Sequence, residues 1–375
     1  MQRRRMIGLM SAAALSILLP GRLALAAREP AGDAAVLGGL VRTHILPRFD
    51  ALADAAGVYA ERLGRFAAAP TADGLEGCRA AHRAVYDAWA GAQHLRVGPL
   101  STELRADRIA FWPERAGVVQ RQILAMLKAR DPKLLEPGGL ARQSAAVQGL
   151  TVLERLLFDE GVTAAGFEGA SSGGDEAGRF RGALAAAVAQ NVLAITREVR
   201  DGWKALEVPL TAGEPTPLGP DAGAAVNALF SSALTALQVV ADQKLLAPLG
   251  PNAGEAKPAV AEALRSGQSA RNVRINLEAL RALMLGEGGG PGLTALLPSG
   301  DAGVQARRTL EEGFTAAIRA AEAIPAPINV AVADPAMRKT VETALQRVKD
   351  VRTLMTGTVA PLLDISIGFN ELDGD

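Results

Sequence analysis

The feature that most restricts this chain is a succession of long segments rich in Ala, Leu, Arg and Glu, divided by short runs of Gly and Pro. These residue types have high helix propensity, and β-branched residues never form the alternating runs that predict strands. Hydrophobic residues make up 49% of the sequence, which is enough to build a sizeable core. The pattern therefore predicts an all-α fold.

The Gly and Pro breakers divide the sequence into nine predicted helices. Their approximate ranges are 34–69, 73–96, 114–130, 140–159, 179–207, 221–247, 256–285, 301–323 and 335–360. A stretch rich in Gly and Ser at 161–178 is the best candidate for a linker between domains. We therefore expect two helical bundles packed against each other, an N-terminal bundle at 27–160 and a C-terminal bundle at 179–375.

Residues 1–26 have the pattern of a secretory signal peptide. Three arginines at positions 3–5 precede an apolar run, and a small-residue pattern predicts cleavage near Ala26. No later stretch approaches the ~20 apolar residues that a membrane span needs. The sequence thus predicts a soluble periplasmic protein with no membrane span after signal removal.

The charge balance changes when the signal is removed. The full sequence has 40 basic and 40 acidic residues, and residues 1–26 hold four arginines and no acid. The exported chain keeps 36 basic against 40 acidic residues, a formal charge of −4. This charge argues against nucleic acid as a partner. A single cysteine, Cys78, excludes an intramolecular disulfide and every zinc site built from several cysteines.

The three histidines are His44, His82 and His94, and no H-E-x-x-H motif is present. His82 and His94 lie on one predicted helix, but they are twelve positions apart, which corresponds to a rise of about 18 Å. They cannot chelate one ion as a pair. We interpret His82 as a packed residue and His94, near the helix end, as a surface residue. His44 lies on a separate helix and is the best candidate for a substitute metal ligand.

Three stretches of the sequence share a pattern with a known family. They are LRVGPL at 95–100 with RIAFWP at 108–113, QGLTVLERLLF at 148–158, and GFNELDGD at 368–375. In this order, behind a signal peptide, they resemble the imelysin family, also called the M75 peptidase family, which includes periplasmic iron-uptake proteins. The resemblance covers essentially the whole mature chain. It implies two helical bundles with a functional site near their interface.

The resemblance also implies a metal-binding motif, G-x-H-x-x-E. In this sequence the motif aligns with Gly149 to Glu154, and Thr151 stands where the family has the histidine. A His and a Glu at this spacing can face one cation, whereas a Thr hydroxyl is a much poorer ligand for zinc or iron. Iron or zinc is therefore the candidate cofactor, with Glu154 and His44 as its candidate ligands.

Two further residues of the matching stretches are candidates for a pocket. Arg96 precedes a Gly-Pro break and either points into a pocket or is an ordinary cation at a helix end. Trp112, before Pro113, either packs between helices or lines a pocket wall.

The sequence favours a non-enzymatic periplasmic binding or accessory protein in iron or other metal handling. The alternative is a helical interaction protein that has lost its metal site and binds a periplasmic or envelope protein. A metallopeptidase is the third hypothesis, because the family carries a peptidase label. Such an enzyme needs about three protein ligands and an activated water, and the motif histidine is missing.

Overall fold

The computed structural model describes residues 30–114, 117–169, 174–325 and 327–366. Within these ranges the chain is helical and contains no strand, only an isolated bridge between Thr216 and Gly219. The prediction of an all-α fold is confirmed. The predicted signal peptide and the motif at 368–375 lie outside the described residues.

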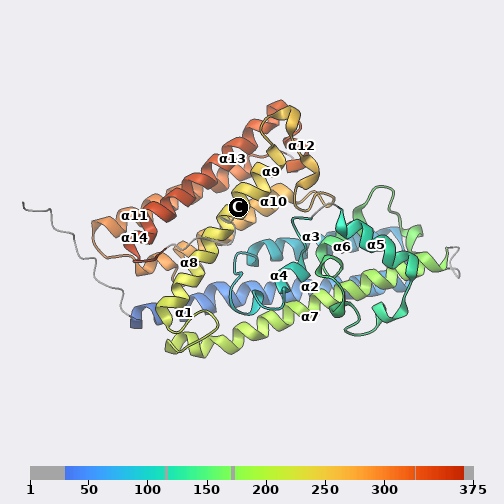
Figure 1. Ribbon diagram of the computed structural model, residues 1–375, viewed down its shortest axis with the longest axis horizontal. Helices are drawn as coiled ribbons and strands as arrows, with labels where there is room; N and C mark the ends of the chain where they lie inside the picture. The colour runs from blue at the N-terminus through green and yellow to red at the C-terminus, as the bar shows by residue number, and fades with distance from the viewer. Residues whose placement is uncertain (1–29, 115–116, 170–173, 326, 367–375) are drawn as a thin grey trace, which may run out of the picture.

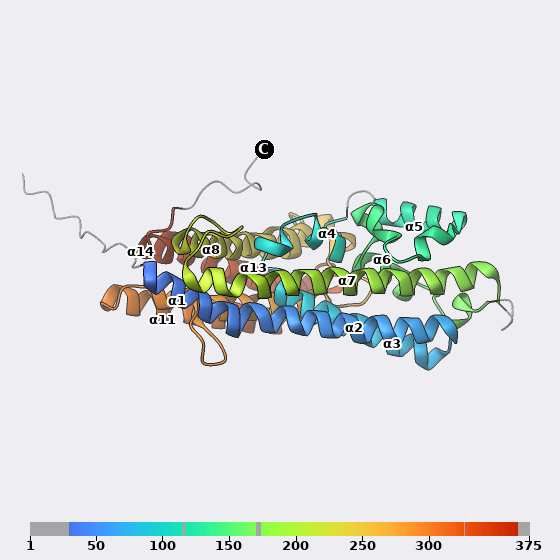
Figure 2. The same cartoon turned by 90° about the horizontal axis from the view of Figure 1, so that it is seen from below.

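The first bundle is built along one long helix. Helix α1 (Pro30–Leu40) continues through a π-helical stretch (Val41–Ile45) into α2 (Leu46–Ala68). Helices α3 (Ala72–Ala92) and α7 (Glu176–Ala212) pack along α2, as Figures 1 and 2 show. Shorter helices cover this layer: α4 (Arg105–Ile109), α5 (Val118–Ala129) and α6 (Leu150–Phe158).

The second bundle follows α7. Its first helix, α8 (Ala222–Gln238), continues through a π-helical stretch (Val239–Leu246) into α9 (Ala247–Leu249). Helix α11 (Asp301–Glu322) packs between its neighbours α10 (Ser269–Leu285) and α13 (Pro335–Leu354). The remaining segments are α12 (Ile328–Ala331), a π-helical stretch (Met355–Val359) and α14 (Ala360–Leu362).

The helices before and after the predicted linker at 161–178 belong to the same first bundle, so this linker does not separate the two bundles. Helix α7 follows it and packs along α2 and α1, so it belongs with the helices that precede the linker. The chain crosses to the second bundle only after α7, near Gly213. A stretch rich in Gly and Ser predicts where a helix ends. It does not predict which helices the next helix packs against, because that depends on the apolar face that the next helix buries.

Side-chain caps fix where several long helices begin. The side chains of Thr71, Asp175 and Asp221 accept backbone N–H bonds at the starts of α3, α7 and α8. These bonds satisfy amide groups that have no partner within the helix. Helix α10 begins at Ser269, later than the predicted start at 256, because the intervening residues form turns and short 3₁₀ segments.

The two bundles meet where α3 packs against α10 and where α1 packs against α8 (Figure 1), and the apolar core is continuous through both. One described helix, Ala222–Leu249, is long and apolar enough to cross a membrane by length and composition alone. More than half of its most apolar part is buried inside the protein, at 56%. We interpret it as a core helix of the second bundle, and the absence of a membrane span stays a prediction.

Candidate functional site

The motif that aligns with G-x-H-x-x-E lies at the start of α6. Gly149 precedes the helix, and a Cβ atom there would overlap the backbone oxygens of Arg108 and Ile109. The Thr151 hydroxyl donates to the backbone oxygen of Phe111 at 3.2 Å. Gly149 therefore allows α6 to pack closely against the end of α4, and Thr151 forms a hydrogen bond to the segment that follows α4.

Glu154 is a buried carboxylate, with 4% of its surface exposed. Its Oε1 accepts from the Ser266 backbone N–H at 2.9 Å and from the Ser266 hydroxyl at 2.7 Å. Burial raises the pKa of Glu154, and the Ser266 hydrogen bonds oppose that rise. Ser266 precedes α10, so the contact joins the motif to the second bundle.

The motif does not fit a zinc or iron site. The Thr151 hydroxyl is directed at a carbonyl oxygen, and Glu154 is directed at Ser266. Among the described residues, no group of three or more His, Cys, Asp and Glu side chains could hold a metal ion. A carboxylate with neither an imidazole nor a second carboxylate beside it is a poor donor set for either ion.

His44 lies in the π-helical stretch between α1 and α2, away from Glu154. The pKa of the Tyr59 hydroxyl is raised well above its usual value, chiefly by burial and also by the nearby charge of Glu154. Glu154 therefore lies at the level of Tyr59 along this helix. Tyr59 is fifteen residues beyond His44 on a nearly continuous helix, a rise of roughly 22 Å. The structure therefore does not bring the two candidate metal ligands together.

The other two histidines are both buried. The Tyr59 hydroxyl and His82 Nδ1 are 3.0 Å apart, and His82 is fully buried, so the packed interpretation is confirmed. The expectation of a surface position for His94 is wrong, since only 1% of it is exposed. The second bundle covers this end of α3, and Ser232 of α8 donates to the His94 backbone oxygen at 2.6 Å.

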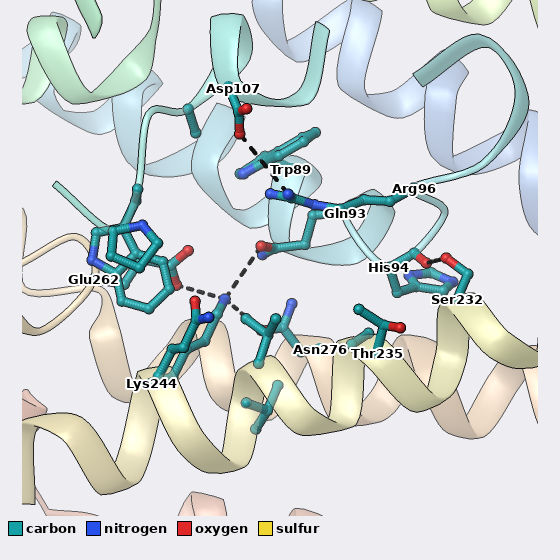
Figure 3. A pocket seen from close by; sticks show the side chains of 17 residues that line it. Trp89, Gln93, His94, Arg96, Asp107, Ser232, Thr235, Lys244, Glu262 and Asn276 are labelled. Atoms are coloured by element: carbon teal, nitrogen blue, oxygen red, sulfur yellow. Dashed lines mark hydrogen bonds and ion pairs between the residues drawn. The ribbon is translucent and has the colours of Figure 1, made fainter. Parts of the chain in front are cut away.

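A pocket of about 850 Å³ lies between the bundles (Figure 3). It brings together Arg96 and Trp112, the two pocket candidates from the sequence. The other lining residues are Trp89, Gln93, His94, Asp107, Ala110, Pro113, Ser232, Thr235, Ala236, Val239, Val240, Gln243, Lys244, Glu262 and Asn276. Arg96 and Pro113 are exposed, so the pocket reaches the protein surface.

A buried lysine organises one wall of this pocket. Lys244 Nζ donates to Glu262 Oε2 and Asn276 Oδ1 at 2.7 Å each, and to Gln93 Oε1 at 3.3 Å. Burial lowers the pKa of Lys244, and the Glu262 carboxylate opposes that change. The ammonium group also lies 5.8 Å from the centre of the Trp112 ring. Sequence reasoning missed Lys244, although a lysine within the apolar run 222–249 was a usable signal.

Lys244 fixes the orientation of Gln93. An ammonium group can only donate, so the Gln93 carbonyl oxygen must face it. The Gln93 amide nitrogen Nε2 then has no hydrogen-bond partner among the described residues, although it is buried. Arg96 lies nearby, and within the described part of the chain its guanidinium pairs only with half-exposed Asp107, at 3.9 Å. The pocket thus offers an unused amide donor and a partly free guanidinium.

The fold and the site define a helical protein of two bundles with a polar pocket at their junction. The family model described as imelysin, or peptidase M75, matches residues 45–355, and the chain belongs to this family.

Two solved structures have a similar fold. An imelysin-like protein from Psychrobacter arcticum is 19% identical with a TM-score of 0.74, covering 92% of this chain and 99% of that chain. A candidate iron-regulated protein A precursor from Parabacteroides distasonis is 15% identical with a TM-score of 0.73, covering 90% and 97% respectively. No curated protein matches the sequence.

Proposed function

We propose that this chain is an exported, non-enzymatic binding protein of iron or other metal handling, which holds its ligand in the pocket between the bundles. The observation that carries the proposal is the pair of donors at Gln93 Nε2 and Arg96 on the pocket lining. Export is supported by the signal pattern at 1–26. A role in iron handling is supported by the name of the Parabacteroides neighbour.

The lining favours a ligand with carboxylate oxygens. Lys244 is neutralised by Glu262, so Arg96 is the cation left to meet an anionic group. The indole rings of Trp89 and Trp112 provide an apolar wall for the rest of the ligand. An iron ion bound by a carboxylate chelator presents such carboxylate oxygens to Arg96. A metal-free carboxylate presents the same oxygens and is the simplest competitor for the pocket.

Calorimetry of the purified protein tests the proposal, with ferric citrate, ferrous ion, zinc ion and metal-free citrate as separate titrants. We expect ferric citrate to bind and Arg96→Ala to weaken it at least ten-fold, about 1.4 kcal/mol. Arg65→Ala is the matched control, because Arg65 is an exposed arginine of α2 paired only loosely with Glu61. Absence of binding tighter than roughly millimolar for every titrant would refute a metal-handling role.

The peptidase hypothesis has its own test. The protein is incubated with an unfolded substrate, with and without a chelator, and fragments are measured by mass spectrometry. We expect no cleavage. Cleavage that the chelator stops and that Glu154→Ala abolishes would replace the binding proposal with a metallopeptidase.

A further inference from the structure

Two buried histidines from distant parts of the sequence face each other at the junction of the bundles. His44 Nε2 and His94 Nε2 are 2.9 Å apart, and their rings meet edge to face at an interplanar angle of 70°. Each side chain is 1% exposed. His44 comes from the π-helical stretch after α1, and His94 follows the end of α3.

The neighbouring carboxylate fixes the proton positions. His44 Nδ1 lies 2.7 Å from Glu287 Oε1, and Arg48 binds both oxygens of Glu287. His44 therefore carries its proton on Nδ1 and has a lone pair on Nε2. His94 must then donate its Nε2–H to His44. This leaves His94 Nδ1 as a buried nitrogen without a hydrogen-bond partner among the described residues.

The arrangement around His44 is that of a metal ligand with its outer partner. Metal-binding imidazoles usually donate the other ring N–H to a carboxylate, which fixes the tautomer and the ring orientation. Glu287 does this for His44 from the loop after α10. Gly290 lets that loop approach the π-helical stretch Val41–Ile45, because a Cβ atom there would overlap the Thr43 side chain. π-helical turns such as the one that holds His44 are frequent at functional sites.

The distance between the two nitrogens is close to what a shared ion needs. Two imidazole nitrogens bound to zinc at 2.0–2.1 Å in tetrahedral geometry are about 3.3 Å apart. The rings must therefore separate by about 0.4 Å, and the His94 proton must move from Nε2 to Nδ1. No proton is gained or lost overall. Burial lowers the pKa of His44 to about 4 and that of His94 well below its usual value, so both are neutral at pH 7.

The pocket borders the pair on the His94 side. His94 is one of the lining residues, and the pocket opens at the exposed Arg96 and Pro113. Two protein ligands leave two positions of a tetrahedral ion for water or for a donor atom of the pocket ligand. Structural zinc sites have four protein ligands, so an ion held by two would be exchangeable.

We propose that His44 and His94 form a two-histidine site for an exchangeable divalent transition-metal ion such as zinc or copper, with Glu287 as the positioning residue for His44. Imidazole nitrogen suits both ions. This inference deepens the proposed function, because it assigns an ion site at the edge of the pocket. It rests on that function only in taking a metal ion as the ligand.

Nuclear magnetic resonance of the wild-type protein is the direct test, because the sequence holds only three histidines. Zinc is titrated into ¹⁵N-labelled protein, and the imidazole nitrogens are followed in long-range ¹H–¹⁵N spectra. We expect the Nε2 signals of His44 and His94 to shift together at saturation while those of His82 stay unchanged. An unchanged His44–His94 pair at millimolar zinc would mean that it is a hydrogen-bonded pair only, and would overturn the inference.

Variants measured by zinc calorimetry provide the second test. We expect Glu287→Gln to weaken zinc binding by roughly 10–100-fold, as loss of an outer carboxylate does elsewhere. His94→Gln should weaken it more. His82→Gln is the matched control, since it also replaces a buried histidine, and its affinity should equal that of the wild type. Equal affinities in all four proteins would refute the site, and the wild-type spectra decide the matter where a variant does not fold.

The same titrations separate this inference from the proposed function. Ferric citrate binding that depends on Arg96, together with unshifted His44 and His94 signals in zinc, would leave the pocket function standing and remove the ion site. Zinc shifts at both histidines without any ferric citrate binding would keep the ion site and remove the pocket proposal.

Discussion

The Lys244 ammonium nitrogen lies 2.7 Å from a carboxylate oxygen of Glu262, and both side chains are almost completely buried, at 2% and 3% exposure. Lys244 belongs to the π-helical stretch after α8, and Glu262 to the turns before α10. Asn272 also donates to Glu262 Oε2 at 3.0 Å, and Asn276 accepts from Lys244. A buried charge pair is stable in such a place because both members have hydrogen-bond partners.

We predict that Lys244→Met lowers the free energy of unfolding by about 3–5 kcal/mol, because it leaves the Glu262 carboxylate buried without its cation. The double variant Lys244→Met/Glu262→Leu should recover most of that loss, since it removes both charges. Urea unfolding at pH 7 measures both effects. A double variant less stable than the single one would contradict this explanation, because removing the unpaired carboxylate would then add to the loss.

Glu154 should make the protein less stable as the pH rises. Its pKa in the folded protein is raised by burial, so the folded state holds its proton more tightly than the unfolded chain does. The stabilising contribution of Glu154 to the free energy of unfolding is complete below the pKa that Glu154 has in the unfolded chain. It is lost as the pH rises through the higher pKa that Glu154 has in the folded protein. Glu154→Gln should therefore be more stable than the wild type at pH 7, with a difference that shrinks toward pH 4.5. Chemical unfolding at several pH values measures this, and a less stable variant at pH 7 would contradict it.

His82 should make the protein less stable as the pH falls, the opposite of the effect of Glu154. Burial lowers its pKa to about 3, so the folded protein binds fewer protons than the unfolded chain between that pH and 6.5. Stability is therefore lost as the pH falls below 6.5. His82→Phe keeps an aromatic ring beside Tyr86 and Phe158 and removes the titrating group. We expect a smaller decrease in melting temperature between pH 7.5 and pH 5 for this variant, and an equal decrease would show that His82 is protonated in the folded state.

Gly149 should tolerate no side chain. A Cβ atom would overlap two backbone oxygens, and backbone atoms yield less easily than a flexible side chain. Gly149→Ala should lower the free energy of unfolding by about 3 kcal/mol, the upper part of the range for overpacking. Gly64→Ala on the exposed face of α2 is the control, because nothing lies within 4 Å of its Cβ position. That variant should gain about 0.5–1 kcal/mol from helix propensity, and similar stabilities for the two variants would contradict the steric explanation.

The sequence determined the helices and much of their extent. The uninterrupted patterns at 34–69 and 335–360 correspond to α1–α2 and α13–α14, because breakers and apolar periodicity act locally. The resemblance to the imelysin family pointed to Arg96 and Trp112, and the structure sets both on the pocket lining. The substitution of Thr151 for the motif histidine was also visible in the sequence alone.

The tertiary structure decided which helices share a bundle and which side chains meet. The linker at 161–178 breaks the chain in sequence, yet α7 returns to α2 because their apolar faces match. His94 was expected at the surface as a helix-end residue, and only the packing of α8 buries it. The contacts of His44 with His94 and of Lys244 with Glu262 join residues on separate elements. Local spacing carries no information about such contacts, because they depend on how the two bundles dock.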